Sequence, residues 1–213
     1  VAVVAVLALV ATITAAGLRL AEERDLAQAN AARADAVSRF LVDTLGQANP
    51  YAGSRGTLTV LDAMDHAAAS LDAGLDQSPE VRRELRATIG NVYLNLDESR
   101  RCLDVLGSAP AATDLSGADP AERARFLILR ASCHVALDER KQAWQEIDAA
   151  EAALGNAEGD AAIGLRAYIL VERGQLLSLD GHLVVANGAF ERAIALADAV
   201  GERLQQYRAR RML

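Results

Sequence analysis

The feature that most constrains this chain is a pattern of small and large residues that recurs three times after residue 89. Each set begins with a small residue. Large residues follow three and sixteen positions later, and small residues follow twelve and nineteen positions later. The three sets are Gly90, Tyr93, Cys102, Leu106 and Ala109; Ala131, His134, Ala143, Ile147 and Ala150; and Gly174, Leu177, Ala186, Phe190 and Ala193. Small residues let two helices approach closely, and large ones fill the space between successive pairs. The pattern therefore predicts antiparallel helix pairs stacked in chain order.

Helix-start signals and composition agree with this prediction. Thr59 with Asp62 forms a capping box, Ser78-Pro79 and Asp119-Pro120 are typical helix starts, and Asp160 is placed to cap another helix. Aromatic residues make up only 4% of the chain, which disfavours strands. The fold class predicted is all-α, a tetratricopeptide-like α-solenoid over residues 79–213 with about three repeats that continue beyond the chain. Because an alanine-rich chain matches small positions by chance, a general helical bundle is the alternative.

The start of the chain predicts a membrane anchor. Residues 1–18 carry no charge, and eighteen helical residues span roughly 27 Å, close to the hydrocarbon thickness of a bilayer. A transmembrane helix is therefore expected there, with a secretory signal segment or a buried core helix as alternatives. Residues 19–50 read as a juxtamembrane linker helix, and residues 57–78 as a leading helix before the repeats.

The order of these segments resembles a known bacterial arrangement. The stretches AEERDLAQANAARADAVSRFLVDTLGQANP and PEVRRELRATIGNVYLNL, followed by the repeats, are similar to the region after the kinase domain in membrane-anchored serine/threonine protein kinases with tetratricopeptide repeats. The resemblance implies a single-pass protein of the bacterial cell membrane, with a cytoplasmic kinase domain before residue 1 and extracytoplasmic repeats. Asp97, Cys102 and His134 depart from the usual repeat residues.

Residues for chemistry are scarce. The chain has no glycine-rich phosphate loop and no kinase catalytic motif, so we expect no enzymatic activity and no cofactor in this segment. Its histidines are isolated in sequence, which disfavours a metal site. A net charge of −7 disfavours nucleic acid as a partner. Cys102 and Cys133 both fall at packing positions, so two free buried thiols are expected, with a disulfide as the alternative in an extracytoplasmic compartment.

The expected function is therefore binding. In each first helix, the positions one, four and five after the small residue should line a groove, and they hold Asn91, Leu94 and Asn95; Ser132, Val135 and Ala136; and Gln175, Ser178 and Leu179. None of these is charged, which favours a protein or peptide ligand with little salt dependence. Alternatively, this surface packs on the linker helix. The module is expected to serve as the sensor or interaction domain of the transmembrane kinase; a membrane-anchored scaffold without a kinase is the alternative.

Overall fold

A computed structural model describes residues 24, 28, 31, 59–72, 79–107, 115 and 117–212. The chain divides into two compact units, residues 1–58 and residues 59–213. The predicted membrane helix (1–18) and nearly all of the linker helix (19–50) lie outside the described residues. In the part that is described, no helix is both long enough and apolar enough to cross a membrane.

The second unit is built from helices. Its elements are α2 (Val60–Asp72), α3 (Pro79–Asn95), α4 (Ser99–Leu106), α5 (Pro120–Ala136), α6 (Arg140–Leu154), α7 (Asp160–Leu179), α8 (Leu183–Val200) and α9 (Arg203–Met212). The described residues contain no strand, and the all-α prediction is confirmed. The element α2 lies within the range expected for the leading helix.

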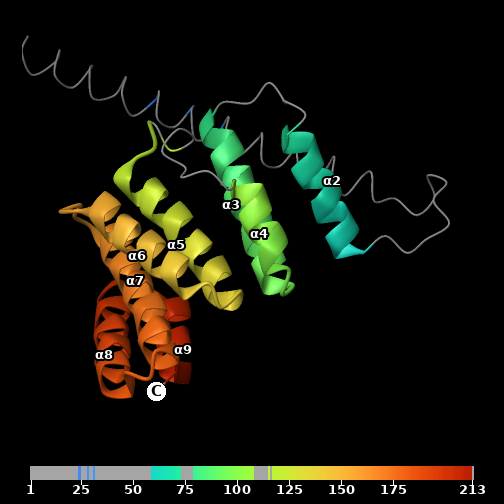
Figure 1. Cartoon of the computed structure of the whole chain (residues 1–213). Coiled ribbons are helices and arrows are strands. Elements are labelled where there is room, and N and C mark those ends of the chain that lie inside the picture. The colour runs from blue at the N-terminus through green and yellow to red at the C-terminus, as the bar shows by residue number, and fades with distance from the viewer. Residues whose placement is uncertain are drawn as a thin grey trace, which may run out of the picture. The chain divides into compact units, whose positions relative to one another are not determined.

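The helices pack in a regular order (Figure 1). Extensive contacts join α3 to α4, α5 to α6 and α7 to α8, so each of these pairs of consecutive helices forms a hairpin. Neighbouring hairpins meet through α4 with α5 and through α6 with α7, while α9 packs on α8. In addition, α5 contacts both α3 and α7, and α7 contacts α9. Every odd-numbered helix from α3 onward therefore touches the next odd-numbered one.

Where the residues are described, helix starts follow the sequence signals with one exception, while the predicted cap Ser78 lies outside the described residues. The Asp62 carboxylate accepts the backbone N–H of Thr59 at 2.9 Å, and the Thr59 hydroxyl accepts that of Asp62 at 3.1 Å, which is the predicted capping box. The Asp119 carboxylate likewise accepts the backbone N–H of Glu122 at 2.8 Å, with Pro120 in the first turn. Asp160 differs from its predicted role. It is the first residue of α7, and Gly159 precedes it as the N-cap without a side-chain bond.

The turn inside each hairpin has the same geometry. Asp97, Asp138 and Gly181, each seven residues after the small residue that opens its repeat, have φ values of 64°, 57° and 82°. The next residue in each case donates its backbone N–H to the carbonyl of Tyr93, His134 or Leu177 at 2.8–2.9 Å. These carbonyls belong to the first large residue of each repeat. Aspartate is among the non-glycine residues that tolerate left-handed backbone, which explains the departure at Asp97.

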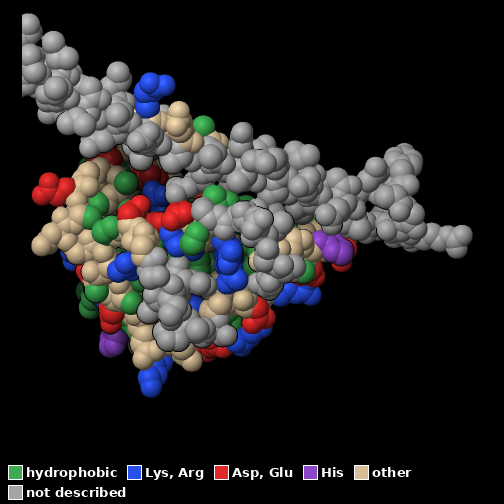
Figure 2. All heavy atoms as spheres, turned by 90° about the horizontal axis from the view of Figure 1, so that it is seen from above, with side chains coloured by type: hydrophobic (Ala, Val, Ile, Leu, Met, Phe, Trp, Pro, Cys, Tyr) green, Lys and Arg blue, Asp and Glu red, His purple; other side chains and the backbone are tan. Residues whose placement is uncertain are grey.

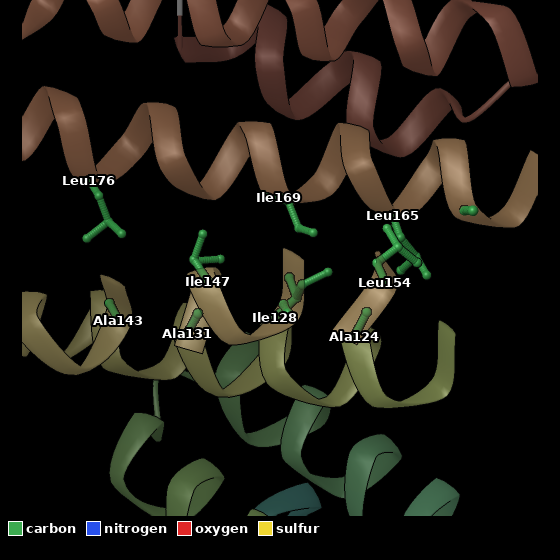
Figure 3. Close-up of a cluster of buried hydrophobic side chains, with 11 residues drawn as sticks. Ala124, Ile128, Ala131, Ala143, Ile147, Leu154, Leu165, Ile169 and Leu176 are labelled. Atoms are coloured by element: carbon green, nitrogen blue, oxygen red, sulfur yellow. The ribbon is translucent and has the colours of Figure 1, made fainter. Parts of the chain in front are cut away.

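The largest described core cluster lies between the second and third hairpins (Figure 3). Leu165, Ile169 and Leu176 point from α7 towards the hairpin of α5 and α6, where Ile128 and Ile147 are fully buried. Alanines at the small positions, such as Ala131 and Ala143, are also fully buried. Burying each large aliphatic side chain contributes roughly 1.5–3 kcal/mol, so this seam is a major source of stability.

Glycine at the small position receives a large side chain from the facing helix. A methyl group placed on Gly90 would lie 3.2 Å from the Leu106 side chain, and one placed on Gly174 would overlap the ring of Phe190. Ala186, another small residue of this repeat, is fully buried, but the side chain nearest to Gly174 is that of Phe190. Phe190 occupies the register position of Leu106, so both hairpins place a large side chain from the same position against the glycine that opens the repeat.

The cysteines overturn one expectation. Cys102 on α4 and Cys133 on α5 are bonded to each other, with their Cα atoms 6.4 Å apart, and neither is a free thiol. Both are fully buried, as the packing pattern predicts. The thiol prediction failed because it treated the two positions separately, whereas contact between α4 and α5 brings them within bonding distance. The bond joins the first hairpin to the second.

Polar contacts also connect successive hairpins. Arg83 pairs with Glu122 at 3.0 Å and Arg100 with Glu139 at 2.9 Å across the first junction. Arg140 pairs with Asp180 at 3.3 Å across the second. On the face drawn in Figure 2, acidic and basic side chains are intermingled, as expected for a surface carrying scattered ion pairs. The Arg100 and Arg140 pairs are exposed and contribute little individually, typically about 0–1 kcal/mol each, whereas the Arg83 side chain is buried.

Candidate functional site

A groove with a cavity volume of about 340 Å³ opens on the face formed by the odd-numbered helices. It is lined by Leu94 of α3; Ser132, Val135 and Ala136 of α5; Tyr168, Glu172 and Gln175 of α7; and Leu204, Tyr207, Arg208, Arg211 and Met212 of α9. No lining residue comes from an even-numbered helix. The alternation of the hairpins thus places their first helices and α9 around one concavity.

The structure brings five of the nine predicted groove residues together here, namely Leu94, Ser132, Val135, Ala136 and Gln175. Asn91, Asn95, Ser178 and Leu179 do not line it. Asn91 and Asn95 are exposed on α3, Ser178 is partly buried, and Leu179 is 46% exposed at the end of α7. The predicted positions fit best in the middle hairpin, where all three of its residues line the groove.

Glu172 is the unexpected member of the site. Its side chain is only 3% exposed, and its Oε1 accepts a hydrogen bond of 2.8 Å from the hydroxyl of Ser132. The other carboxylate oxygen, Oε2, is buried and has no hydrogen-bond partner. Burial raises the pKa of Glu172 to about 7, against the lowering effects of the Ser132 hydrogen bond and of the Arg208 charge. Glu172 therefore changes charge near neutral pH.

Two arginines of α9 bring positive charge to the groove. The Arg208 guanidinium lies over the ring of Tyr168, 5.0 Å from its centroid, and the Tyr168 hydroxyl is 3.5 Å from the Ser132 hydroxyl. Arg211 is exposed and one helical turn further along α9. Neither arginine forms an ion pair with any described residue. The predicted set contained no charge, whereas the lining set contains Glu172, Arg208 and Arg211.

Apolar side chains line the same concavity. Leu204, Tyr207 and Met212 of α9 are 56%, 63% and 43% exposed, and Leu94 and Val135 are partly buried. A hydrophobic lining with a few convergent polar groups is typical of binding sites.

Sequence reasoning missed seven of the lining residues. Glu172 carried a usable signal, because it occupies the register position of Leu129, a buried apolar residue of the second repeat. A carboxylate at a position that packs in the neighbouring repeat marks a special environment. The residues of α9 gave no such signal, since the repeat pattern stops before them.

The remaining candidates take structural roles. His134 lies in a hairpin end, where its Nδ1 is 2.7 Å from a Glu139 oxygen. Hydrogen bonds from His134 and Arg100 lower the pKa of Glu139, so this carboxylate stays ionised. In the described ranges, no three histidine, cysteine, aspartate or glutamate residues are grouped so as to hold a metal ion.

Comparisons of the chain with protein-family models, with curated proteins and with solved structures find no match.

Proposed function

We propose that residues 79–213 form a tetratricopeptide-like α-solenoid that binds a peptide segment of a protein partner in its groove. The observation that carries the proposal is the origin of the groove lining: all of it comes from α3, α5, α7 and α9. In stacked helix pairs, the first helices of successive pairs form one continuous surface that receives extended or helical peptides.

The repeat register supports the solenoid part of the proposal. Left-handed turn residues recur at the same offset, at Asp97, Asp138 and Gly181. The contact of a glycine with a large side chain sixteen positions later also recurs, between Gly90 and Leu106 and between Gly174 and Phe190. A bundle without repeats has no reason to reproduce both the turn and the contact at fixed positions.

The wider setting rests on the sequence. From the resemblance and from the uncharged residues 1–18, we propose that this chain is the non-catalytic sensor region of a bacterial transmembrane serine/threonine kinase. The disulfide between Cys102 and Cys133 supports an extracytoplasmic location of the repeats, because disulfides persist in oxidising compartments.

The test is selection of peptides from a random displayed library against the whole chain. We expect selected peptides to bind the chain and to lose at least tenfold in affinity, about 1.4 kcal/mol, when Ala136→Trp fills the groove. Ala149→Trp is the matched control, because Ala149 is also an exposed helical alanine of the second hairpin but lies outside the groove lining.

Equal loss in both variants, or in neither, would contradict binding in the groove. Melting curves of the two variants, followed by circular dichroism, check that each keeps its fold.

A further inference from the structure

We propose that the groove selects peptides carrying an acidic side chain, whose carboxylate is bound by Arg208 and Arg211, and that the charge of Glu172 in the same groove controls the affinity. The inference rests on the proposed peptide groove and names the chemistry of its ligand.

Two arginines of α9 are available to bind an anionic group of a ligand. Arg208 and Arg211 are three residues apart on α9, so their side chains share a helix face, and both line the groove. Neither has a carboxylate partner within 4 Å among the described residues, whereas seven other arginine side chains of this unit form such pairs. A carboxylate suits guanidinium groups, which can bind it through two parallel hydrogen bonds.

Glu172 places a buried carboxyl group in the same groove. It is the only acidic residue in the lining, and its Oε2 is buried without a hydrogen-bond partner. The elements around it present the Ser132 hydroxyl from α5, the Tyr168 hydroxyl one turn earlier on α7, and the Arg208 charge from α9. When Glu172 is neutral, the groove holds two positive charges and no negative one. When it is ionised, its charge opposes an anionic ligand inside a weakly screened site.

A basic ligand fits these observations less well. Its charge would have to reach Oε2, which is buried, and it would be repelled by both arginines. An acidic side chain needs only to reach the guanidinium groups, of which Arg211 is exposed.

The charge of Glu172 makes the affinity for an acidic peptide depend on pH. Glu172 is neutral below its raised pKa of about 7 and ionised above it, while a glutamate in a peptide stays ionised throughout this range. The affinity for an acidic peptide should therefore fall as pH rises from 6 to 8, by about five- to tenfold if binding favours the neutral form strongly.

The experiment measures fluorescence anisotropy of short labelled peptides against the whole chain at pH 6 and pH 8. The peptides share one apolar sequence with blocked ends, and their central residues are glutamates, glutamines or lysines. A fourth peptide has central glutamines and a free terminal carboxylate. We expect the glutamate peptide to bind most tightly and to weaken at pH 8.

Two variants assign the effect to residues. Glu172→Gln fixes the neutral form and keeps a partner for Ser132, so it should bind the glutamate peptide equally at both pH values, as tightly as the original does at pH 6. Arg208→Gln with Arg211→Gln should remove the preference for glutamate over glutamine. Arg192→Gln, at an exposed position of α8 outside the groove, is the control for loss of a positive charge. It should change neither the pH dependence nor the preference for the glutamate peptide.

Each outcome has a clear consequence. Equal binding of the glutamate and glutamine peptides, with both lost in Ala136→Trp, overturns this inference and leaves the peptide groove standing. Tightest binding of the lysine peptide, or of the peptide with a free terminus, also overturns it. If none of the peptides binds and library selection fails as well, both proposals fall.

Discussion

The first and third hairpins share a register but are stabilised by different interactions. In the third, α7 and α8 are 20 and 18 residues long, and the ring of Phe190 is packed directly against the backbone at Gly174. In the first, α4 has only 8 residues, and Leu106 stands further from Gly90. A short second helix buries less apolar surface, and the first hairpin instead has covalent and polar links to its neighbours.

The difference shows how repeats of unequal length can share one register. Where both helices are long, close apolar packing is enough. Where one is short, the disulfide of Cys102 links it to the second hairpin, and exposed ion pairs from Arg100 and Arg101 add a smaller contribution. The variants below separate these two ways of stabilising a hairpin.

The largest effect is expected from losing the disulfide. The bond closes a segment with a sequence separation of 31 residues, which corresponds to about 3–4 kcal/mol of stabilisation in the chain-entropy model. Reduction of the whole chain, or Cys102→Ala with Cys133→Ala, should lower the free energy of unfolding by that order in a denaturant titration. Reductant should have no effect on the double variant. An unchanged midpoint after reduction would show that the first hairpin does not depend on the bond.

A smaller effect is expected from adding a methyl group at the two glycine contacts. Gly174→Ala forces the buried ring of Phe190 to move and should cost about 1–3 kcal/mol. Gly90→Ala requires Leu106 to move only by tenths of an ångström, and the better helix propensity of alanine offsets part of that cost. The melting temperature of Gly174→Ala should therefore be clearly lower than that of Gly90→Ala. The reverse order would mean that the third hairpin is the more loosely packed.

The smallest effects are expected in the turns. Gly181→Ala places a Cβ in left-handed backbone without any steric neighbour, which should cost about 1 kcal/mol. Asp97→Gly removes the side chain from a residue in the same left-handed conformation, which should stabilise the fold by less than about 1 kcal/mol. Gly188→Ala is the matched control, because it lies inside α8 with open space around it and should stabilise slightly. If Gly181→Ala stabilises as much as Gly188→Ala, the backbone at residue 181 is not left-handed.

Local signals in the sequence were sufficient for much of the fold. The helix starts at Thr59 and Asp119 could be predicted because a cap depends on residues three positions apart. The register of the hairpins could be predicted because small and large residues must alternate where helices cross. Even the unusual turn at Asp97 keeps the position that the pattern gives it.

Features that depend on contacts between distant residues could not be predicted in the same way. The partner of Cys102 is decided by how α4 meets α5. The charge of the groove is decided by α9, which returns against α7 and places Arg208 over Tyr168. Comparison with Leu129 marks the position of Glu172 as unusual, but its surroundings depend on contacts from α5 and α9, which no spacing within one repeat encodes.

The disulfide also affects how this chain would respond to mechanical load. A pull on the two ends of an oxidised molecule passes directly from Cys102 to Cys133, so most of α5 lies outside the stretched path. The 31-residue separation corresponds to roughly 100–110 Å of extended contour that is withheld until the bond is reduced. In an oxidising compartment the junction between the first two hairpins would therefore act as an inextensible link, while the hairpins on either side remain free to yield.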